Sequence, residues 1–255
     1  MKGIGQMKKL FFVVCILITS NIIFASNSNG NYLIILEPDT LEIKALNYSK
    51  SSADSSVTIN IEYPQISGLE NSDIETKINS FLEEEFKQSI PWYEEILADS
   101  TEYQDYPYEI GYSFETGFQV QFNSKKFISI LLNHYQFTGG AHGNYFALGY
   151  NLIIDEGEAL TLKDIIREDS FDLLTYECEQ AILEAYQTNS LLEAGLFENE
   201  LVIPEDQDFF ITPTALVIQF DPYEVGPYAM GEIVAEIPFE KIKDILQDNL
   251  PFPTN

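Results

Sequence analysis

The chain has 255 residues, of which 45% are hydrophobic and 13% aromatic, so it is long enough and apolar enough to bury a substantial core. It carries 41 acidic residues against 13 Lys and Arg, a formal net charge of −28. Such a field repels phosphate backbones and anionic lipids, which makes nucleic acid and anionic membranes poor partners, and it attracts cationic proteins.

The first 26 residues predict a secretory signal peptide. A basic region with three lysines is followed by an apolar region and a small-residue cleavage site: Lys2, Lys8, Lys9, residues 11–18 and Ala25–Ser26. The apolar region is too short for a stop-transfer helix, and no second long apolar stretch follows. We therefore expect an extracytoplasmic protein, periplasmic or secreted, with no transmembrane span after signal removal.

Removal of this signal would sharpen the charge imbalance, leaving 10 basic and 41 acidic residues, a net charge of about −31. Lipoprotein anchoring through Cys15 is disfavoured, because Val13 and Val14 precede it instead of a small residue. Without Cys15, Cys178 has no disulfide partner. Its place on an apolar helical stripe favours a small buried hydrophobe over a reactive thiol.

The N-terminal elements begin after a polar linker at residues 27–31, within a segment of linker and N-terminal strands at 27–54. Alternating apolar residues predict a strand over 57–63 that ends at Pro64. A helix follows, with Ser72 and Glu75 as its capping box and Pro91 as its end. Its apolar positions are Ile74, Ile78, Phe81, Leu82 and Phe86.

Strands dominate the next segment. Alternation around Phe118–Phe122 predicts one strand, and an apolar run at 127–136 predicts a central strand. A glycine-rich turn (TGGAHGN, 138–144) leads to a second apolar strand at 145–154.

A helical element capped by Thr161 comes next, with one apolar face formed by Leu174, Cys178, Ala181, Ile182 and Ala185. Strands are then expected at 209–211, 216–220 and 233–237, and a short helix at 239–246. Because strands and helices are grouped instead of strictly alternating, we predict an α+β fold, a mainly antiparallel sheet with a few packed helices. We expect two interlocked α+β subdomains, residues 55–154 and 155–255.

Catalytic and metal-binding motifs are missing from the sequence. It has no phosphate-binding glycine loop, no dinucleotide fingerprint and no zinc-protease helix, and two histidines cannot form a three-histidine zinc site. We therefore expect no cofactor and no metal. His134 shares a strand face with Ile128, Ile130 and Leu132, which favours a half-buried histidine with satisfied hydrogen bonds.

Two loops are candidate binding sites. The turn at 138–144 contains Gly139, Gly140 and His142; its glycines either admit a ligand close to the backbone or serve the hairpin geometry alone. The segment 221–228 (DPYEVGPY) combines rigid backbone with aromatic rings, which suits a recognition surface, although such tyrosines can also pack under a loop. Its candidate residues are Pro222, Tyr223, Pro227 and Tyr228.

Several motifs in this order resemble a two-part extracytoplasmic domain of formally unknown function. They are PQISG (64–68), TGGAHGN (138–144), LTLKDII (160–166) and the segment 211–238, so the resemblance covers roughly residues 55–245. The resembled domain forms the outer portion of lysozyme-sensing anti-sigma factors, and its first part precedes the catalytic domain of certain peptidoglycan deacetylases. In the sensors it binds lysozyme and is not an enzyme.

The chain departs from both settings. We see no transmembrane helix after the signal, no cytoplasmic sigma-binding segment and no deacetylase domain, so sigma-factor control is not implied. The leading hypothesis is a secreted or periplasmic non-catalytic binding protein of the cell envelope, whose partner is lysozyme or another cationic or cell-wall-associated protein. The alternatives are an envelope hydrolase that acts on peptidoglycan or a glycan through acidic residues and His142, and a purely structural envelope domain.

Overall fold

The computed structural model describes residues 24–26, 32–34, 39–53, 56–98 and 111–254. The chain divides into two compact units, residues 1–37 and 38–255. In the first unit, β1 (Phe24–Ser26) pairs with β2 (Tyr32–Ile34) in antiparallel register. The rest of the predicted signal peptide and the predicted linker at 27–31 lie outside the described residues, so export stays a prediction. No helix of the described residues is long and apolar enough to cross a membrane.

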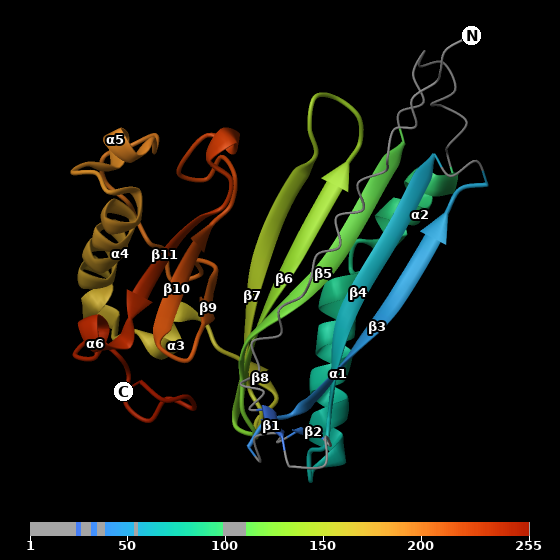
Figure 1. Cartoon of the computed structure of the whole chain (residues 1–255), viewed down its shortest axis with the longest axis horizontal. Helices are drawn as coiled ribbons and strands as arrows, with labels where there is room; N and C mark the ends of the chain where they lie inside the picture. Colours follow the sequence, from blue (N-terminus) through green and yellow to red (C-terminus); the bar gives the residue numbers. More distant parts are fainter. Residues whose placement is uncertain (1–23, 27–31, 35–38, 54–55, 99–110, 255) are drawn as a thin grey trace. The chain divides into compact units, whose positions relative to one another are not determined.

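The second unit contains a six-stranded sheet whose strands lie in chain order (Figure 1). They are β3 (Glu42–Ser51), β4 (Val57–Ser67), β5 (Tyr112–Asn123), β6 (Phe127–Phe137), β7 (Asn144–Ile153) and β8 (Glu158–Ala159). Neighbouring strands are antiparallel except β4 and β5, which run parallel. A parallel pair needs a long crossover, and α1 (Ser72–Lys87) and α2 (Ile90–Ala98) lie in it.

The start of α1 differs by one residue from the prediction. Asn71, not Ser72, is the N-cap, and its side chain accepts two backbone N–H groups of the first turn. The Glu75 carboxylate instead accepts the backbone N–H of Leu69 at 2.9 Å. The prediction that Pro91 ends the helix is also wrong: α1 ends before it, and Pro91 lies in the first turn of α2, where a missing N–H costs no helical hydrogen bond.

Strand β4 continues past Pro64, where the sequence predicts its end. Pro64 pairs with Ala45 of β3, whereas β5 pairs with β4 only over 57–61. At Pro64 the strand therefore has one neighbour among the described strands, and a residue without an N–H is tolerated where one side of a strand is open.

Helices α1 and α2 cover one face of the six-stranded sheet (Figure 1). Ile78, Leu82 and Phe86 of α1 are buried at the helical spacing that the sequence predicts. The Tyr93 ring of α2 stacks on Phe114 of β5, with ring centroids 4.1 Å apart. Burial of each large apolar side chain contributes about 1.5–3 kcal/mol to folding.

The C-terminal part of the second unit has a three-stranded antiparallel sheet in the order β11-β10-β9. Its strands are β9 (Phe209–Ile211), β10 (Ala215–Phe220) and β11 (Ile233–Pro238). Its helices are α3 (Leu162–Ile165), η2 (Glu168–Ser170), α4 (Phe171–Tyr186), α5 (Leu191–Ala194), η3 (Tyr228–Met230) and α6 (Phe239–Ile242). Helices α4 and α6 and the sheet bury a common apolar core. The α+β fold class and the three C-terminal strands are confirmed.

Three details of this part correct the sequence predictions. The helical element that begins at Thr161 is broken into α3, η2 and α4, and the expected last helix ends at Ile242 instead of residue 246. Ala185 is exposed, so the buried stripe of α4 is Leu174, Cys178 and Ile182. Cys178 is a free, fully buried thiol, as predicted, and burial raises its pKa.

The two sheets meet along a junction between β9 and the strands β6 and β7. Asn151 donates to the Phe209 carbonyl at 2.8 Å, and the Ser129 hydroxyl accepts the Ile211 N–H at 2.9 Å. A Cβ atom added at Gly149 would lie 1.8 Å from the Phe209 carbonyl oxygen, so only glycine lets β9 approach β7 this closely. The predicted subdomain boundary, between residues 154 and 155, stays a prediction.

Candidate functional site

The two loops that the sequence singles out lie in contact. The His142 ring, in the turn between β6 and β7, stacks on the Tyr228 ring of the β10–β11 connection, with centroids 3.9 Å apart and an interplanar angle of 19°. The Tyr228 hydroxyl also donates to the Gly143 carbonyl at 2.6 Å. The hydrogen bond joins residues 85 positions apart in the chain, and the stacked rings are one position further apart.

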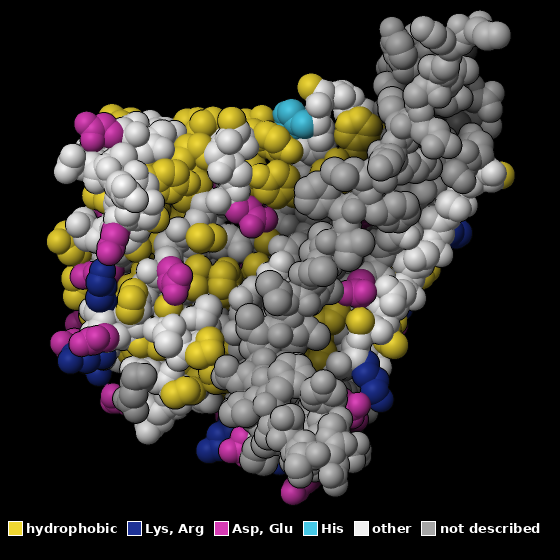
Figure 2. Space-filling model, viewed as in Figure 1, with side chains coloured by type: hydrophobic (Ala, Val, Ile, Leu, Met, Phe, Trp, Pro, Cys, Tyr) yellow, Lys and Arg dark blue, Asp and Glu magenta, His cyan; other side chains and the backbone are white. Residues whose placement is uncertain are grey.

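Two more tyrosines complete the group. The centroid of the Tyr145 ring lies 5.5 Å from that of Tyr228, and the Tyr223 ring centroid lies 5.7 Å from it on the same loop. We call His142, Tyr145, Tyr223 and Tyr228 the loop-aromatic cluster. Figure 2 shows hydrophobic side chains gathered over the α5 and β10–β11 end of the visible face, with acidic side chains among them. Such amphipathic rings bury area at small entropic cost on binding.

The turn from β6 to β7 is shaped by its glycines. Gly139 and Gly140 have φ of 92° and 97°, a region that favours glycine. A Cβ at Gly143 would lie 2.5 Å from the far end of the Tyr135 ring, which would have to move aside to admit another residue. His142 is exposed, and its Nδ1 lies 2.9 Å from the Gly143 carbonyl, so Nδ1 carries the proton and donates. Hairpin geometry explains the glycines, and their role in binding stays a prediction.

The β10–β11 connection holds Tyr223 in a left-handed backbone conformation. Its φ is 72°, which is strained for a residue other than glycine. Its N–H donates to the Gly226 carbonyl at 3.0 Å, and its side chain is largely exposed, at 57%. Pro222 and Pro227 are half-buried, and Pro227 precedes η3 with a φ of −69°, so the prolines shape the loop more than they present a surface.

Carboxylates border the cluster on the side of β7. The Asp221 carboxylate accepts the Ala147 N–H at 3.0 Å, and Gln219 donates to the Ala147 carbonyl at 3.0 Å. The Asp208 carboxylate accepts the Gly149 N–H at 3.4 Å. These side chains thus make hydrogen bonds with backbone groups of β7. They do so in the part of β7 that β8 does not reach, because β8 pairs only with Leu152 and Ile153 of β7.

This arrangement crowds negative charge. Burial raises the pKa of Asp208 to about 6, and nearby carboxylates, Asp221 first among them, add to the effect. Burial also raises the pKa of Asp221 and, together with Asp221, that of Glu232. Among the described residues, the ion pairs lie elsewhere, so no Lys or Arg neutralises these groups.

Sequence reasoning missed three members of this site: Tyr145, Asp221 and Glu232. Asp221 lies within the segment that the sequence indicated, directly before Pro222, but nothing marks it apart from the many other acids. Tyr145 reads as an ordinary strand residue, and only its contact with a loop more than 80 residues away gives it a place in the site.

His134 has the structural role that the sequence favours and is more deeply buried than expected, at 5% exposure. The Tyr93 hydroxyl lies 3.0 Å from its Nε2, and the Thr116 hydroxyl lies 3.1 Å from its Nδ1. Burial lowers its pKa, so the ring is held neutral. It lies in the core beneath α2 and plays no part in the cluster.

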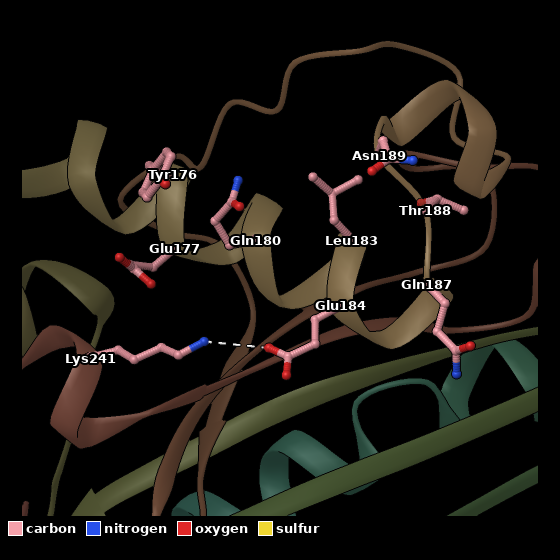
Figure 3. A pocket seen from close by; sticks show the side chains of 9 residues that line it. All are labelled: Tyr176, Glu177, Gln180, Leu183, Glu184, Gln187, Thr188, Asn189 and Lys241. Carbon is pink, nitrogen blue, oxygen red and sulfur yellow. Dashed lines mark ion pairs between the residues drawn. The ribbon is translucent and has the colours of Figure 1, made fainter.

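A hollow lies along α4 and the turn that follows it (Figure 3), an open depression of about 680 Å³. Its lining is mostly polar: Tyr176, Glu177, Gln180, Leu183, Glu184, Gln187, Thr188, Asn189 and Lys241. Lys241 pairs with Glu184 at 3.5 Å across it. None of the residues predicted from the sequence as a site lines this hollow. No group of three or more His, Cys, Asp or Glu side chains in the described ranges could hold a metal ion.

Two family models match consecutive parts of the chain. The model described as "Deacetylase PdaC" matches residues 50–145, and the model described as "Protein of unknown function (DUF3298)" matches residues 163–240. Both loops of the candidate site fall within these matches, the turn at 138–144 in the first and the segment 221–228 in the second.

A curated relative is peptidoglycan-N-acetylmuramic acid deacetylase PdaC of Bacillus subtilis. It is 21% identical over 196 residues, which cover 74% of this chain and 38% of the deacetylase, so the chain matches well under half of that protein. At this coverage, the matched regions are not shown to be catalytic.

Two crystal structures of DUF3298 proteins have a similar fold. One, from Bacteroides fragilis, is 20% identical with a TM-score of 0.65; the matched region covers 83% of this chain and 95% of the Bacteroides chain. The other, from Pseudomonas aeruginosa, is 18% identical with a TM-score of 0.66; the matched region covers 85% of this chain and 99% of the Pseudomonas chain. Together these matches fit a two-part domain of unknown function, whose first part is similar to the PdaC family model and whose second part is similar to the DUF3298 family model and fold.

Proposed function

We propose that this protein is a non-catalytic binding module of the cell envelope that recognises a cationic partner protein through the loop-aromatic cluster. The observation that carries the proposal is the stacking of His142 on Tyr228, which brings the two candidate loops into one surface. Gly139, Gly140, Pro222 and Pro227 form the backbone frame of that surface.

The charge of the chain supports a basic partner. A net charge of −28, or about −31 without the predicted signal, accelerates encounter with a cationic protein more than it sets the final affinity. Affinity and specificity then come from rigid aromatic side chains at the centre of the contact. Lysozyme is such a protein, and the resemblance to the outer domain of lysozyme sensors makes it the first partner to test.

The compartment follows from the same reasoning. The relative in Bacillus subtilis acts, by its name, on peptidoglycan, a polymer outside the cytoplasm. Together with the predicted signal peptide, this supports an extracytoplasmic location, where secreted basic proteins are met.

The test is a titration of lysozyme against wild-type protein and Tyr223→Ala at two salt concentrations. Tyr223 is 57% exposed, so its truncation leaves the fold intact, and loss of an anchoring tyrosine is expected to cost about 2 kcal/mol or more of binding free energy. Tyr176→Ala, at a ring 52% exposed on α4, is the matched control and should bind as wild type does.

Salt separates specific recognition from charge alone. Exposed charges are screened beyond roughly 8 Å at physiological ionic strength, so added salt should mainly slow association. Binding that disappears at moderate salt, and that is indifferent to Tyr223, would leave only nonspecific attraction and reject the proposal.

An enzymatic alternative is favoured by one observation, the match to a deacetylase of peptidoglycan. Under this alternative the purified chain should release acetate from peptidoglycan, and His142→Ala should abolish the release. We expect no release from the wild type, because the described contacts of the exposed His142 ring are with the Gly143 carbonyl and the Tyr228 ring, and neither pairs it with a serine or cysteine nucleophile.

A further inference from the structure

Negative charge and aromatic surface meet at one edge of the loop-aromatic cluster. Asp221 and Glu232 flank the loop that carries Tyr223 and Tyr228, and both carboxylates are close enough to Tyr145 to act on its hydroxyl electrostatically. The Asp221 carboxylate accepts the Ala147 N–H and is also hydrogen-bonded by the Gln219 side chain, both uncharged groups, so its charge is not neutralised. Glu232 makes no hydrogen bond or ion pair within the described part of the chain; the residue as a whole is exposed, although its carboxylate is partly desolvated by the packed loop.

The rings leave faces for a ligand. Tyr223 is 57% exposed and His142 is exposed, while Tyr145 and Tyr228 are half-buried between them. Tyr145 packs closely on the β10–β11 connection, because a Cβ at Gly231 would lie 3.3 Å from its hydroxyl. That contact brings the residue after Gly231, which is Glu232, to the rim of the cluster.

We propose that this rim binds an arginine side chain of the partner, with its guanidinium against the tyrosine rings and beside the carboxylates of Asp221 and Glu232. The inference rests on the proposed function and names the chemistry of the contact. It follows from the pairing of ring faces, which attract cations, with carboxylates that have no Lys or Arg partner among the described residues.

Other ligand types fit this rim less well. A neutral sugar would cover the rings but leave the two carboxylates unneutralised, and an anion would be repelled. Lysine carries a compact, strongly hydrated charge, whereas the planar guanidinium stacks on aromatic faces and bridges carboxylate oxygens with several N–H groups. A basic partner presents many such side chains, so the rim selects among them by shape.

The experiment follows backbone amide NMR signals during titration with three capped peptides, Gly-Gly-X-Gly-Gly, in which X is arginine, lysine or citrulline. Citrulline has the shape of arginine without its charge. With the arginine peptide we expect saturable signal shifts at Gly143, Tyr228 and Glu232. The lysine peptide should bind about tenfold more weakly, a difference that corresponds to the size of one cation–π contact. The citrulline peptide should show no saturable binding.

Two variants test the carboxylates. Glu232→Gln keeps the size of an exposed side chain without its charge, and Asp221→Asn keeps an oxygen for the Ala147 N–H. Each should weaken binding of the arginine peptide about tenfold, whereas Glu236→Gln, at an exposed position on β11, should not.

Equal binding of the arginine and citrulline peptides, or wild-type binding by Glu232→Gln and Asp221→Asn, would overturn the inference. If lysozyme still binds in a Tyr223-dependent way in those cases, the proposed function survives and only the arginine contact is rejected. If the peptides bind as expected while lysozyme does not, the contact stands and lysozyme is the wrong partner.

Discussion

At the scale of single residues, the backbone decides which residue type fits at a few positions. Gly149 is in ordinary strand pairing with Leu131, yet the Phe209 carbonyl lies where its Cβ would be. Tyr223 is the opposite case, a large residue held at a φ of 72° that glycine would adopt freely. Strain of this kind persists where the surrounding structure over-determines the conformation, and here it presents an exposed ring beside Tyr228.

Gly149→Ala should destabilise the protein by more than about 2 kcal/mol, because the added methyl meets a backbone carbonyl that cannot rotate away without moving β9 from β7. Urea unfolding measures the change. Gly117→Ala is the matched control in β5: its Cβ would have no neighbour within 4 Å, so we expect its midpoint to stay close to that of the wild type. Similar midpoints for the two variants would contradict the packing argument.

At the scale of elements, most strands were predictable because alternating or continuous apolar residues report burial directly, as in β6 between β5 and β7. Boundaries were less predictable. Asn71 and Ser72 are both good caps one position apart, and Pro91 suits a helix start as well as a helix end. Local sequence alone does not decide where a helix begins or ends at such positions. The packing of the adjacent helical turn decides it.

The end of α4 gives an element-scale prediction. Gln187 is the C-cap with a left-handed φ of 55°, and its N–H donates to the Glu184 carbonyl. Glycine adopts this conformation without strain, so Gln187→Gly should raise stability by about 0.5–1 kcal/mol. The same change at Gln180, inside the helix, should lower stability by about 1 kcal/mol. The melting temperatures of the two variants should therefore shift in opposite directions. If Gln187→Gly is less stable than the wild type, the argument that the left-handed conformation strains Gln187 is wrong.

At the scale of the whole molecule, composition predicts a strongly acidic chain, and the cationic partner inferred from it stays a prediction; composition does not predict how the site is assembled. The cluster depends on a contact between a hairpin turn and a loop 85 residues later, and no local pattern links His142 to Tyr228. Likewise, among 41 acids, only the fold distinguishes Asp208 and Asp221, which hold the backbone of β7, from those in solvent.

Those carboxylates predict how stability depends on pH. The pKa of Asp208 is about 6 in the folded protein against an ordinary 3.8, so between these values the folded state binds more protons than the unfolded state. Stability from this group is therefore fully present below about pH 4 and is lost as pH rises through about 6, by at most roughly 3 kcal/mol. The raised pKa of Asp221 acts in the same direction.

Asp208→Asn should remove this loss, because the amide oxygen still accepts the Gly149 N–H and carries no charge to desolvate. We expect the variant to be more stable than the wild type at pH 7 and to differ less from it at pH 4, as measured by urea unfolding at both values. Asp155→Asn, in the exposed turn after β7, is the control and should shift neither. If Asp208→Asn is less stable than the wild type at pH 7, the carboxylate contributes more through its bond to β7 than it costs by burial, and the junction between the sheets is held by that charge.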